Sequence, residues 1–563
     1  MKNNEIGLKK KNQYNNGQVE KVTMPNGAIV NKQMGEYYSQ VNKPKVTHLT
    51  NKISVLEHFS IDNTVVIQGD SGLIIWDTGF NMGVGKQKFE AIRKFTDKPI
   101  KAVIYSHNHY TSGARPFVPK GSEGKEIEVI AHPDVHKNLL SSSVELGKML
   151  KKTTAQHFGF FLPKEGPDAS PVSYDGSKEA DKTSGYVQPT YGVRDKEKME
   201  IDGVEFQFFH TPSDTMDSLT AWLPEHDAVI TNSIWHVLPN MYTLRGQPYR
   251  DPLYWLEGID QVRKLNPKIL IPAHGEPVST KESSYELATN YRDAIAFIYS
   301  QTIRGINKGL KPDEIAEEIT LPEHLANHPR LSEVYGELTH QVKGVYSGLI
   351  GWFSLDAADI NPISTQYRSE KIVEGFGGIE KVIQASKKAL EEREYAWTAE
   401  LITHVLNIHP DMEQARLIKA KALREMGQAT PALSSRGFYL SQALHLEGKI
   451  DLNNVSNPYL PIERSIKLLE YKIDPEKLGQ IDKLLKICFS DLTECYGLHM
   501  RKGVAEFLEE EPTDPDITLK ISSNLWITFV LGKMEIEEVM KESNVQVEGD
   551  QSVLIEVMQA FEL

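Results

Sequence analysis

Short apolar runs alternate with helical patterns from about residue 53 to residue 277. Residues 63–68 (NTVVIQ) and 72–76 (GLIIW) are rich in β-branched residues, and the Gly-Asp-Ser-Gly sequence between them predicts a β-hairpin. Residues 86–96 have helical spacing, and residues 102–105 are expected to form a buried strand. Further strands are expected at residues 128–131, 204–210, 219–223, 228–231 and 268–272. This order favours two layers of strands with helices outside, over the alternative of a doubly wound parallel sheet.

The pattern becomes helical after residue 282. Apolar residues recur at four-residue spacing within residues 379–427, and the sequence His-Pro-Asp at 409–411 divides them into a helix–turn–helix pair. After Pro458 the composition changes again. Strand-like runs at residues 486–490, 495–500 and 504–508 precede two helical patterns, which predicts a small α+β domain.

Composition and charge exclude several classes of function. A chain of 563 residues is long enough for about three domains. With 63 basic and 77 acidic residues the formal charge is −14, which argues against a nucleic-acid-binding surface. No apolar run follows the basic N-terminus, so we expect a cytoplasmic protein without a signal peptide or transmembrane segment. The two cysteines, Cys488 and Cys495, are expected to be reduced thiols on paired strands.

Two histidines directly follow the predicted strand at 102–105. His107 and His109 lie in the run IYSHNHYTSGA, and imidazoles at positions i and i+2 can point to the same side and bind one metal ion. Three later segments place further candidate ligands near strand ends: Asp214 or Asp217 in HTPSDTMDS, Asn232 in VITNSIW and His274 in ILIPAHG. A metal held by such residues can lower the pKa of bound water and polarise an ester oxygen.

Residues 140–195 differ in composition from their surroundings. They are rich in Gly, Pro, Ser and Lys, and such a long insertion in a compact domain is usually functional or disordered. We expect this segment to lie over the active site as a lid. Its phrase FGFFLPKEGP supplies apolar surface, which either covers an alkyl chain or anchors the lid.

Taken together, these motifs resemble the alkylsulfatase branch of the metallo-β-lactamase superfamily. IIWDTG, SHNH, HTPSDTMDS, NMYTLRG and IPAHG occur in the order that this branch uses. The resemblance implies an α/β catalytic domain over residues 1–345, an αββα metallo-β-lactamase sandwich with its lid at about 140–195. It also implies an all-α dimerisation domain over 346–450, a small α+β sterol-carrier-like domain over 458–563, and a homodimer formed through the helices.

The resemblance also implies a first metal site. In that family one metal is bound by two histidines and a glutamate. Carried over, these positions fall on His107, His109 and Asp214, with Asp217 as the alternative carboxylate. Zn²⁺ suits two histidines and one carboxylate, and Fe²⁺ and Mn²⁺ remain open.

A second metal site of the family is largely lost. Its positions fall on Thr111, Ser112 and His274, of which only His274 is a competent ligand. The carboxylate that bridges the two metals in the family falls on Asn232, a neutral amide. Without these anionic ligands two nearby dications would repel one another, so one metal is expected.

Anion recognition in the family implies further residues. Arg245 of YTLRG is the expected sulfate-binding arginine, since a guanidinium can hold two oxygens; a loop-fixing salt bridge is its alternative role. Tyr191 is the candidate tyrosine from the lid, and His236 is the candidate proton donor, because Pro239 stands where an alkylsulfatase can carry a histidine. Asp77 matches a position that orients the metal-binding loop.

The implied function is metal-dependent hydrolysis. The expected substrate is an amphiphilic, anionic small molecule, an alkyl sulfate or similar ester, which is cleaved to an alcohol plus sulfate. Because one metal site is substituted, two alternatives stay open. The chain could instead be a mononuclear iron or manganese enzyme of another reaction class, or a non-catalytic lipid-binding descendant.

Overall fold

The computed structural model describes residues 14–172, 181–454 and 460–563. Within these ranges the chain forms two compact units. The larger unit takes residues 14–139, 149–172 and 181–454, and the smaller takes residues 140–148 and 460–563.

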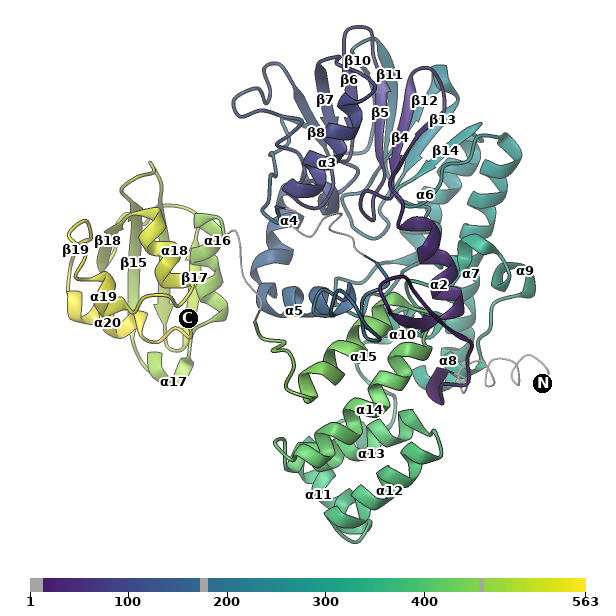
Figure 1. Cartoon of the computed structure of the whole chain (residues 1–563). Helices are drawn as coiled ribbons and strands as arrows, with labels where there is room; N and C mark the ends of the chain where they lie inside the picture. Colours follow the sequence, from purple (N-terminus) through teal and green to yellow (C-terminus); the bar gives the residue numbers. More distant parts are fainter. Residues whose placement is uncertain (1–13, 173–180, 455–459) are drawn as a thin grey trace. The chain divides into compact units, whose positions relative to one another are not determined.

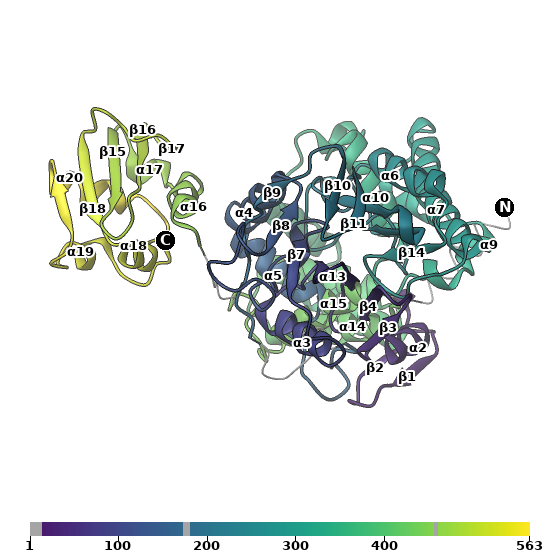
Figure 2. The same cartoon turned by 90° about the horizontal axis from the view of Figure 1, so that it is seen from above.

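Two β-sheets form the centre of the larger unit (Figures 1 and 2). The first sheet has the strand order β3-β4-β5-β6-β7-β8-β9, and the second has the order β10-β11-β12-β13-β14. The strands are β3 (Lys45–His48), β4 (Ile53–Glu57), β5 (Thr64–Gln68), β6 (Leu73–Trp76), β7 (Ile100–Ile104), β8 (Glu128–Ala131), β9 (Tyr191–Gly192), β10 (Lys196–Ile201), β11 (Val204–His210), β12 (Leu219–Leu223), β13 (Ala228–Thr231) and β14 (Ile269–Pro272).

The pairing of the strands includes the predicted hairpin. β5 and β6 run antiparallel with Gln68 opposite Leu73, so the turn lies at residues 69–72. Strands β6 to β9 then pair in parallel. In the second sheet β10 to β13 are antiparallel, and β14 joins β13 in parallel. Where neighbouring strands run parallel, the loops that follow their carboxyl ends lie at one edge of the sheet. The candidate ligands that follow β7, β13 and β14 lie in such loops.

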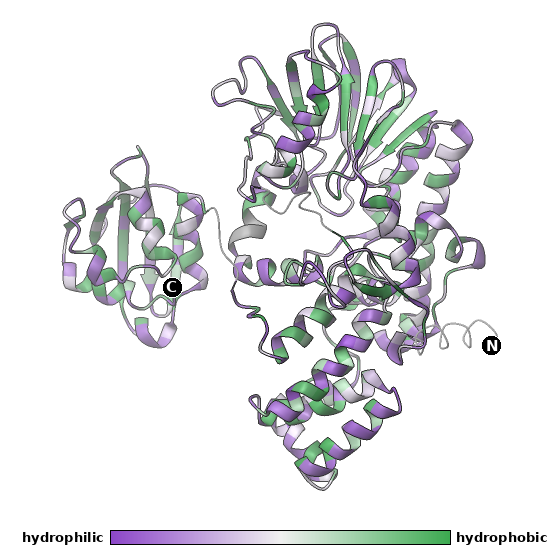
Figure 3. Cartoon of the chain, in the orientation of Figure 1, coloured by the Kyte–Doolittle hydropathy of each residue, from purple (hydrophilic) through white to green (hydrophobic). Residues whose placement is uncertain are grey.

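Apolar side chains from the facing surfaces of both sheets form one core. Its members include Ile67, Trp76, Ile104, Phe206, Ala221 and Ile271, and Figure 3 shows hydrophobic residues concentrated on these strands. Helix α3 (Met82–Arg93) contributes Ala91 and Ile92 to a second core on the outer face of the first sheet. Helices α6 (Pro252–Leu265) and α7 (Lys281–Asn307) pack on the outer face of the second sheet. The predicted α/β fold with αββα layers is confirmed.

Helices make up the rest of the larger unit. They include α10 (Leu338–Ile350), α11 (Thr365–Gly375), α12 (Ile379–Glu391), α13 (Tyr395–Ile408), α14 (Glu413–Ala429) and α15 (Leu433–Leu446). The predicted break at 409–411 separates α13 from α14. No helix of the described residues is both long and apolar enough to cross a membrane.

One buried arginine joins the helical part to the sandwich part. The side chain of Arg436 on α15 has 0% exposure. Its guanidinium donates hydrogen bonds to four backbone carbonyls, those of Ile29, Pro167, Ala169 and Gly427. These carbonyls belong to an N-terminal strand, to the segment after helix α5 (Gly147–His157), and to α14, so three distant parts of the sequence meet at one side chain.

The smaller unit is the predicted α+β domain. Its sheet has the order β17-β16-β15-β18-β19, with strands β15 (Asp482–Phe489), β16 (Cys495–Arg501), β17 (Val504–Leu508), β18 (Ile517–Ile521) and β19 (Gln546–Glu548). The prediction of reduced thiols was wrong. Cys488 lies directly opposite Cys495 in the antiparallel β15–β16 pair with their Cα atoms 4.2 Å apart, and the two form a disulfide.

Candidate metal centre

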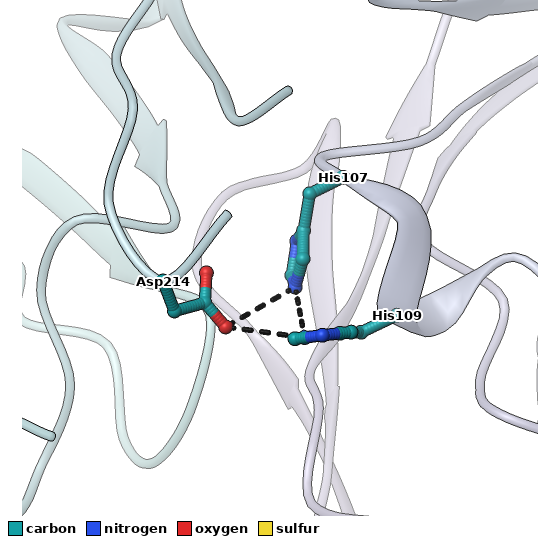
Figure 4. A group of neighbouring side chains, drawn as sticks. All are labelled: His107, His109 and Asp214. Carbon is teal, nitrogen blue, oxygen red and sulfur yellow. Dashed lines mark hydrogen bonds and ion pairs between the residues drawn. The ribbon is translucent and has the colours of Figure 1, made fainter. Parts of the chain in front are cut away.

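His107 and His109 project toward one another where strand β7 gives way to a short turn (Figure 4). Strand β7 ends at Ile104, His107 is extended, and the short 3₁₀ turn Asn108–Tyr110 follows at once. The two imidazole rings therefore lie edge to face, with their centroids 4.7 Å apart. His107 is fully buried and His109 is partly exposed.

Asp214, from the loop between β11 and β12, completes a group of three ligand atoms (Figure 4). His107 Nε2 and His109 Nδ1 are 3.0 Å apart, and Asp214 Oδ2 lies 3.6 Å from the first and 3.1 Å from the second. Bonds of about 2.0–2.1 Å to one tetrahedral zinc would place its ligand atoms about 3.3 Å apart. The three residues thus fit a single metal ion.

Asp217, the alternative carboxylate, does not join this group. It is fully buried, and both of its carboxylate oxygens lie 3.1 Å from Asn108 Nδ2, which donates to them. Asp217 therefore holds the loop that carries the histidines. Asp214 faces the two histidines and Asp217 faces Asn108. Sequence spacing alone does not distinguish these two roles.

The protonation states of the group suit a cation. Burial lowers the pKa of His107 to about 4 and also lowers the pKa of His109. Burial alone would raise the pKa of Asp214, but the two histidines and Arg250 outweigh it and hold that pKa well below its usual range. At neutral pH the group is two neutral imidazoles and one carboxylate, which is the state that a divalent metal requires.

Metal affinity is therefore expected to resist mild acid. A histidine with its ordinary pKa of about 6.5 would lose about tenfold in affinity per pH unit below that value. For His107 the competing proton binds only as the pH falls toward about 4, so affinity should change little between neutral pH and about pH 5. Calorimetric titration of the metal-free protein with metal across this pH range measures the affinity. A steep decline beginning near neutrality would contradict the prediction.

The residues expected at the second metal site do not form one. Thr111 Oγ1 donates to the Asn108 carbonyl, and Ser112 Oγ accepts from Ser184 Oγ. The Nε2 atom of His274 lies 3.3 Å from the hydroxyl of Tyr110, and its Nδ1 lies 2.7 Å from the Ile61 carbonyl. His274 was expected as a metal ligand, but the structure does not place it in the ligand group, because the phenol of Tyr110 takes its free nitrogen.

Asn232 was also expected as a ligand, and the structure gives it a different position. Its Nδ2 atom donates to Asp214 Oδ1 at 2.5 Å and also contacts Ser213 and Ser218. Its Oδ1 atom is buried and has no hydrogen-bond partner among the described residues. Asn232 thus orients the carboxylate of Asp214 and leaves the other carboxylate oxygen for the two histidines.

A cavity of about 250 Å³ opens onto this group. Its polar lining includes His109, Asp214, Arg245 and Arg250. Its walls are mainly apolar and aromatic, formed by Tyr37, Tyr38, Val41, Phe80, Phe158, Phe160, Trp235 and Val237 among others. A few convergent polar groups in an apolar hollow are typical of a site for an amphiphilic small molecule.

The expected lid contributes to this cavity. Thr154, Phe158 and Phe160 line it, but much of the segment is helical, as α4 (Asp134–Val144) and α5, rather than structureless. Residues 173–180 of the expected lid lie outside the described residues. A wall that sequence reasoning missed comes from helix α2 (Lys32–Val41), whose Tyr37, Tyr38 and Val41 reach the cavity.

Arg245 lies in the cavity wall without a carboxylate partner. None of the described acidic side chains makes an ion pair with it, and its Nε atom is buried and has no hydrogen bond. Burial lowers its pKa, and Tyr335, Asp214 and Tyr110 counteract that effect. A half-buried guanidinium without an ion-pair partner among the described residues, next to an apolar hollow, is suited to bind an anion.

Two other predicted catalytic residues do not lie in the cavity lining. Tyr191 is 38% exposed on β9 at the sheet edge, and its hydroxyl donates to Glu197. The two-residue strand carries it to the surface, and it is not among the residues that line the cavity with Arg245. His236 is buried, and its Nδ1 accepts the Glu276 N–H at 3.1 Å. Neither is placed as expected.

Residues missed by sequence reasoning include Arg250 and Gln247. Arg250 has 5% exposure, and one of its N–H groups donates to the Asn240 carbonyl at 2.6 Å. Another donates to Gln247 Oε1. Arg250 follows Arg245 by five residues in LRGQPYR, and a second arginine so close to the first was the available signal.

The loops around the centre are held by buried polar contacts. The backbone N–H of Ser106 donates to Asp77 Oδ1 at 2.8 Å, as expected for a residue that orients the histidine loop. Lys88 Nζ lies 2.6 Å from Asp62 Oδ2, and both side chains have 0% exposure. Asp62 follows Ile61, whose carbonyl contacts His274, so this ion pair anchors a wall of the cavity.

Replacing Lys88 with methionine is expected to lower the free energy of unfolding by about 3 kcal/mol, because Asp62 would stay buried without its partner. Urea denaturation followed by circular dichroism measures this change. The double variant Asp62→Asn/Lys88→Met removes both charges and should regain most of the loss. A single variant as stable as the unmodified chain would contradict the prediction.

Comparison with known proteins gives the family. The metallo-beta-lactamase superfamily matches residues 59–274, the alkyl sulfatase dimerisation family matches residues 311–449, and the alkyl sulfatase C-terminal family matches residues 459–563.

Individual relatives match most of the chain. It is 32% identical over 483 residues to a linear primary-alkylsulfatase of a Pseudomonas species, covering 81% of this chain and 90% of that protein. It is 24% identical over 531 residues to the alkyl/aryl-sulfatase BDS1 of Saccharomyces cerevisiae, covering 91% and 82%. The fold resembles that of the sec-alkylsulfatase Pisa1 from Pseudomonas sp., with a TM-score of 0.84, 23% identity and coverage of 95% of this chain and 87% of that chain. The chain therefore belongs to the alkylsulfatase family of metallo-β-lactamase-fold hydrolases.

Proposed function

We propose that this protein is a mononuclear metal-dependent hydrolase that cleaves an alkyl sulfate, or a similar anionic ester, to an alcohol plus sulfate. The observation that carries the proposal is the convergence of His107 Nε2, His109 Nδ1 and Asp214 Oδ2 within 3.6 Å of one another at the wall of an apolar cavity. The names of the related alkylsulfatases support the substrate class.

Different side chains would contact the anionic end and the alkyl end of the substrate. His107, His109 and Asp214 would hold one divalent ion, with Zn²⁺ expected, which when bound supplies a Lewis acid and lowers the pKa of a coordinated water. Arg245, unpaired in the wall, binds the anionic head group through its planar N–H donors. Phe158, Phe160 and Trp235 cover the alkyl chain and exclude water from it.

The direct test is metal content followed by turnover. Mass spectrometry should find one divalent metal per chain, and dodecyl sulfate should be hydrolysed after loading with Zn²⁺, Mn²⁺ or Fe²⁺ in turn. Release of inorganic sulfate reports the reaction. A folded protein with one bound metal that releases no sulfate with any of the three ions would refute the hydrolase proposal.

An iron enzyme of another reaction class is the second candidate. Two histidines and one carboxylate on one face also form the ligand set of non-haem Fe²⁺ oxygenases. Purification without added metal distinguishes the two functions. About one equivalent of iron together with oxygen consumption would favour this candidate, and zinc without oxygen consumption would favour the hydrolase.

A homodimer is proposed from the helical part. Large apolar side chains are exposed between α10 and α11, with Trp352 at 79%, Leu355 at 53% and Ile360 at 55%. These residues lie within the segment that matches the alkyl sulfatase dimerisation family, and such a patch is typical of an interface. Light scattering tests the proposal.

The remaining domain assignments are also proposals. We retain a catalytic domain over residues 1–345, a dimerisation domain over 346–450 and a sterol-carrier-like domain over 458–563 that gathers amphiphilic substrate. The cytoplasmic location is likewise a prediction, which cell fractionation would test.

A further inference from the structure

Helix α5 carries a buried histidine whose partner lines the cavity. His157, the last residue of α5, has 1% exposure and is not among the residues that line the cavity. Its Nε2 atom lies 3.1 Å from the hydroxyl of Tyr335, and the two rings meet edge to face with their centroids 5.3 Å apart. Tyr335 does line the cavity, together with Arg245. His157 thus contacts a phenol that shares this hollow with the candidate anion-binding arginine.

The packing of α5 fixes the place of His157. The end of α5 lies so close to α15 that a Cβ atom on Gly437 would come within 3.0 Å of the His157 carbonyl oxygen. One turn earlier on α5, Thr153 Oγ1 donates to the Arg245 carbonyl at 2.5 Å. One helix therefore contacts both Arg245, through its backbone, and Tyr335, through its hydroxyl.

The direction of the hydrogen bond between His157 and Tyr335 follows from the other ring nitrogen. Burial holds the pKa of His157 well below its usual range, so the ring is neutral at neutral pH and carries one proton. Its Nδ1 atom is buried and has no hydrogen-bond partner among the described residues. An N–H group there would be an unpaired buried donor, which is rarer in folded proteins than an unpaired acceptor. The proton is therefore on Nε2, and His157 donates to the Tyr335 oxygen.

The proton of the Tyr335 hydroxyl is left for the cavity. Its oxygen accepts from His157, and among the described residues no other side chain or carbonyl hydrogen-bonds to this hydroxyl. Burial raises the pKa of Tyr335, and Arg245 and Arg250 only partly counteract this effect, so the phenol keeps its proton at neutral pH. The hydroxyl and the guanidinium of Arg245 are then two donors that an anion in the cavity can accept from.

We infer that His157 is a positioning residue for the anionic head group of the substrate, because it holds the Tyr335 hydroxyl with its proton directed into the cavity. The inference rests on the proposed function, in which Arg245 binds that head group. Tyr335 and Arg245 would then donate to different oxygens of one sulfate. Without His157 the O–H group is free to turn away, and part of its hydrogen bond to the anion is lost.

Two replacements of His157 in the full-length chain test the inference, with inorganic sulfate as the probe and calorimetry as the measurement. His157→Met removes the donor together with the unpaired Nδ1 atom, so the chain should stay folded while its sulfate affinity falls by about tenfold, as for one lost hydrogen bond. His157→Gln keeps an N–H donor and should restore most of the affinity. The matched control is His404→Met, which should leave affinity unchanged; His404 Nδ1 lies 3.0 Å from the hydroxyl of Ser369 on α11.

A replacement of the tyrosine distinguishes positioning from structural support. Tyr335→Phe removes the hydroxyl, and sulfate affinity should fall by about 10–100-fold, as for a hydrogen bond to a charged group. In that background His157→Met should cause no further loss, because the histidine acts only through the hydroxyl. An equal loss in both backgrounds, or no loss from His157→Met alone, would overturn the inference.

Turnover separates the inference from the proposed function. His157→Met should raise KM for an alkyl sulfate and leave kcat unchanged, because the contact to the head group is made in the ground state as well as in the transition state. Sulfate binding that depends on His157 in a protein without turnover would refute the hydrolase and support the inference. Turnover together with sulfate binding that does not depend on His157 would do the reverse. A chain that binds no sulfate would also overturn the inference.

Discussion

Replacing Asp214 with alanine is expected to abolish stoichiometric metal binding and to lower alkyl sulfate turnover by at least about 10³-fold, since a bound metal supplies several kcal/mol of transition-state stabilisation. Asp214 is the one anionic member of the ligand group. Without it, two neutral imidazoles would have to hold a dication alone. Metal analysis after gel filtration and sulfate release under saturating metal measure the two effects.

Asp217 offers a matched control for this experiment. It is a buried aspartate three residues away, but its oxygens accept from Asn108 rather than facing the histidines. Asp217→Asn keeps one oxygen acceptor and should retain the metal. If Asp217→Asn lost the metal while Asp214→Ala kept it, the assignment of the carboxylate would be wrong. If both variants kept it, the centre itself would lie elsewhere.

Replacing Arg245 with alanine is expected to lower kcat/KM for an alkyl sulfate by about 10³-fold, because the charged head group would lose its bidentate partner in a largely apolar cavity. Arg245→Lys keeps the charge but not the planar fork, and should lose about tenfold. The exposed Arg304→Ala is a control that should change nothing. Steady-state kinetics with a series of alkyl sulfates gives these values.

Stability separates this role from a structural one. Arg245 makes no ion pair with any described residue, and its buried Nε–H has no hydrogen-bond partner, which costs folding free energy. The alanine variant should therefore be as stable as the unmodified chain or slightly more stable, while its activity falls. A variant that unfolds at lower denaturant concentration would instead support a loop-fixing role for the arginine.

Patterns within one element were predictable from the sequence. The runs at 65–67 (VVI) and 73–76 (LIIW) are continuously apolar, which fits strands that are buried on both faces, and short runs of this kind rich in β-branched residues favour strands. His107 and His109 were predictable as a pair, because their spacing is local. The loss of the second metal site followed from side-chain chemistry, since Thr111 and Ser112 cannot replace a carboxylate and an imidazole.

Contacts between distant elements were not predictable in the same way. Tyr191 was expected at the cavity from its place in the lid segment, but a two-residue strand at the sheet edge carries it to the surface. Tyr110 lies between the two histidines and the substituted positions, and nothing local shows that its hydroxyl reaches His274, 164 positions away in the sequence. Cys488 and Cys495 were expected on paired strands, and only the register places them directly opposite one another.

The four carbonyls that Arg436 satisfies lie up to 407 positions away from it in the sequence. If the chain ended before α15, it would lack Arg436, and these buried carbonyls would have no hydrogen-bond donor. The metal-binding half is therefore not expected to fold as an independent module when it is expressed without α15.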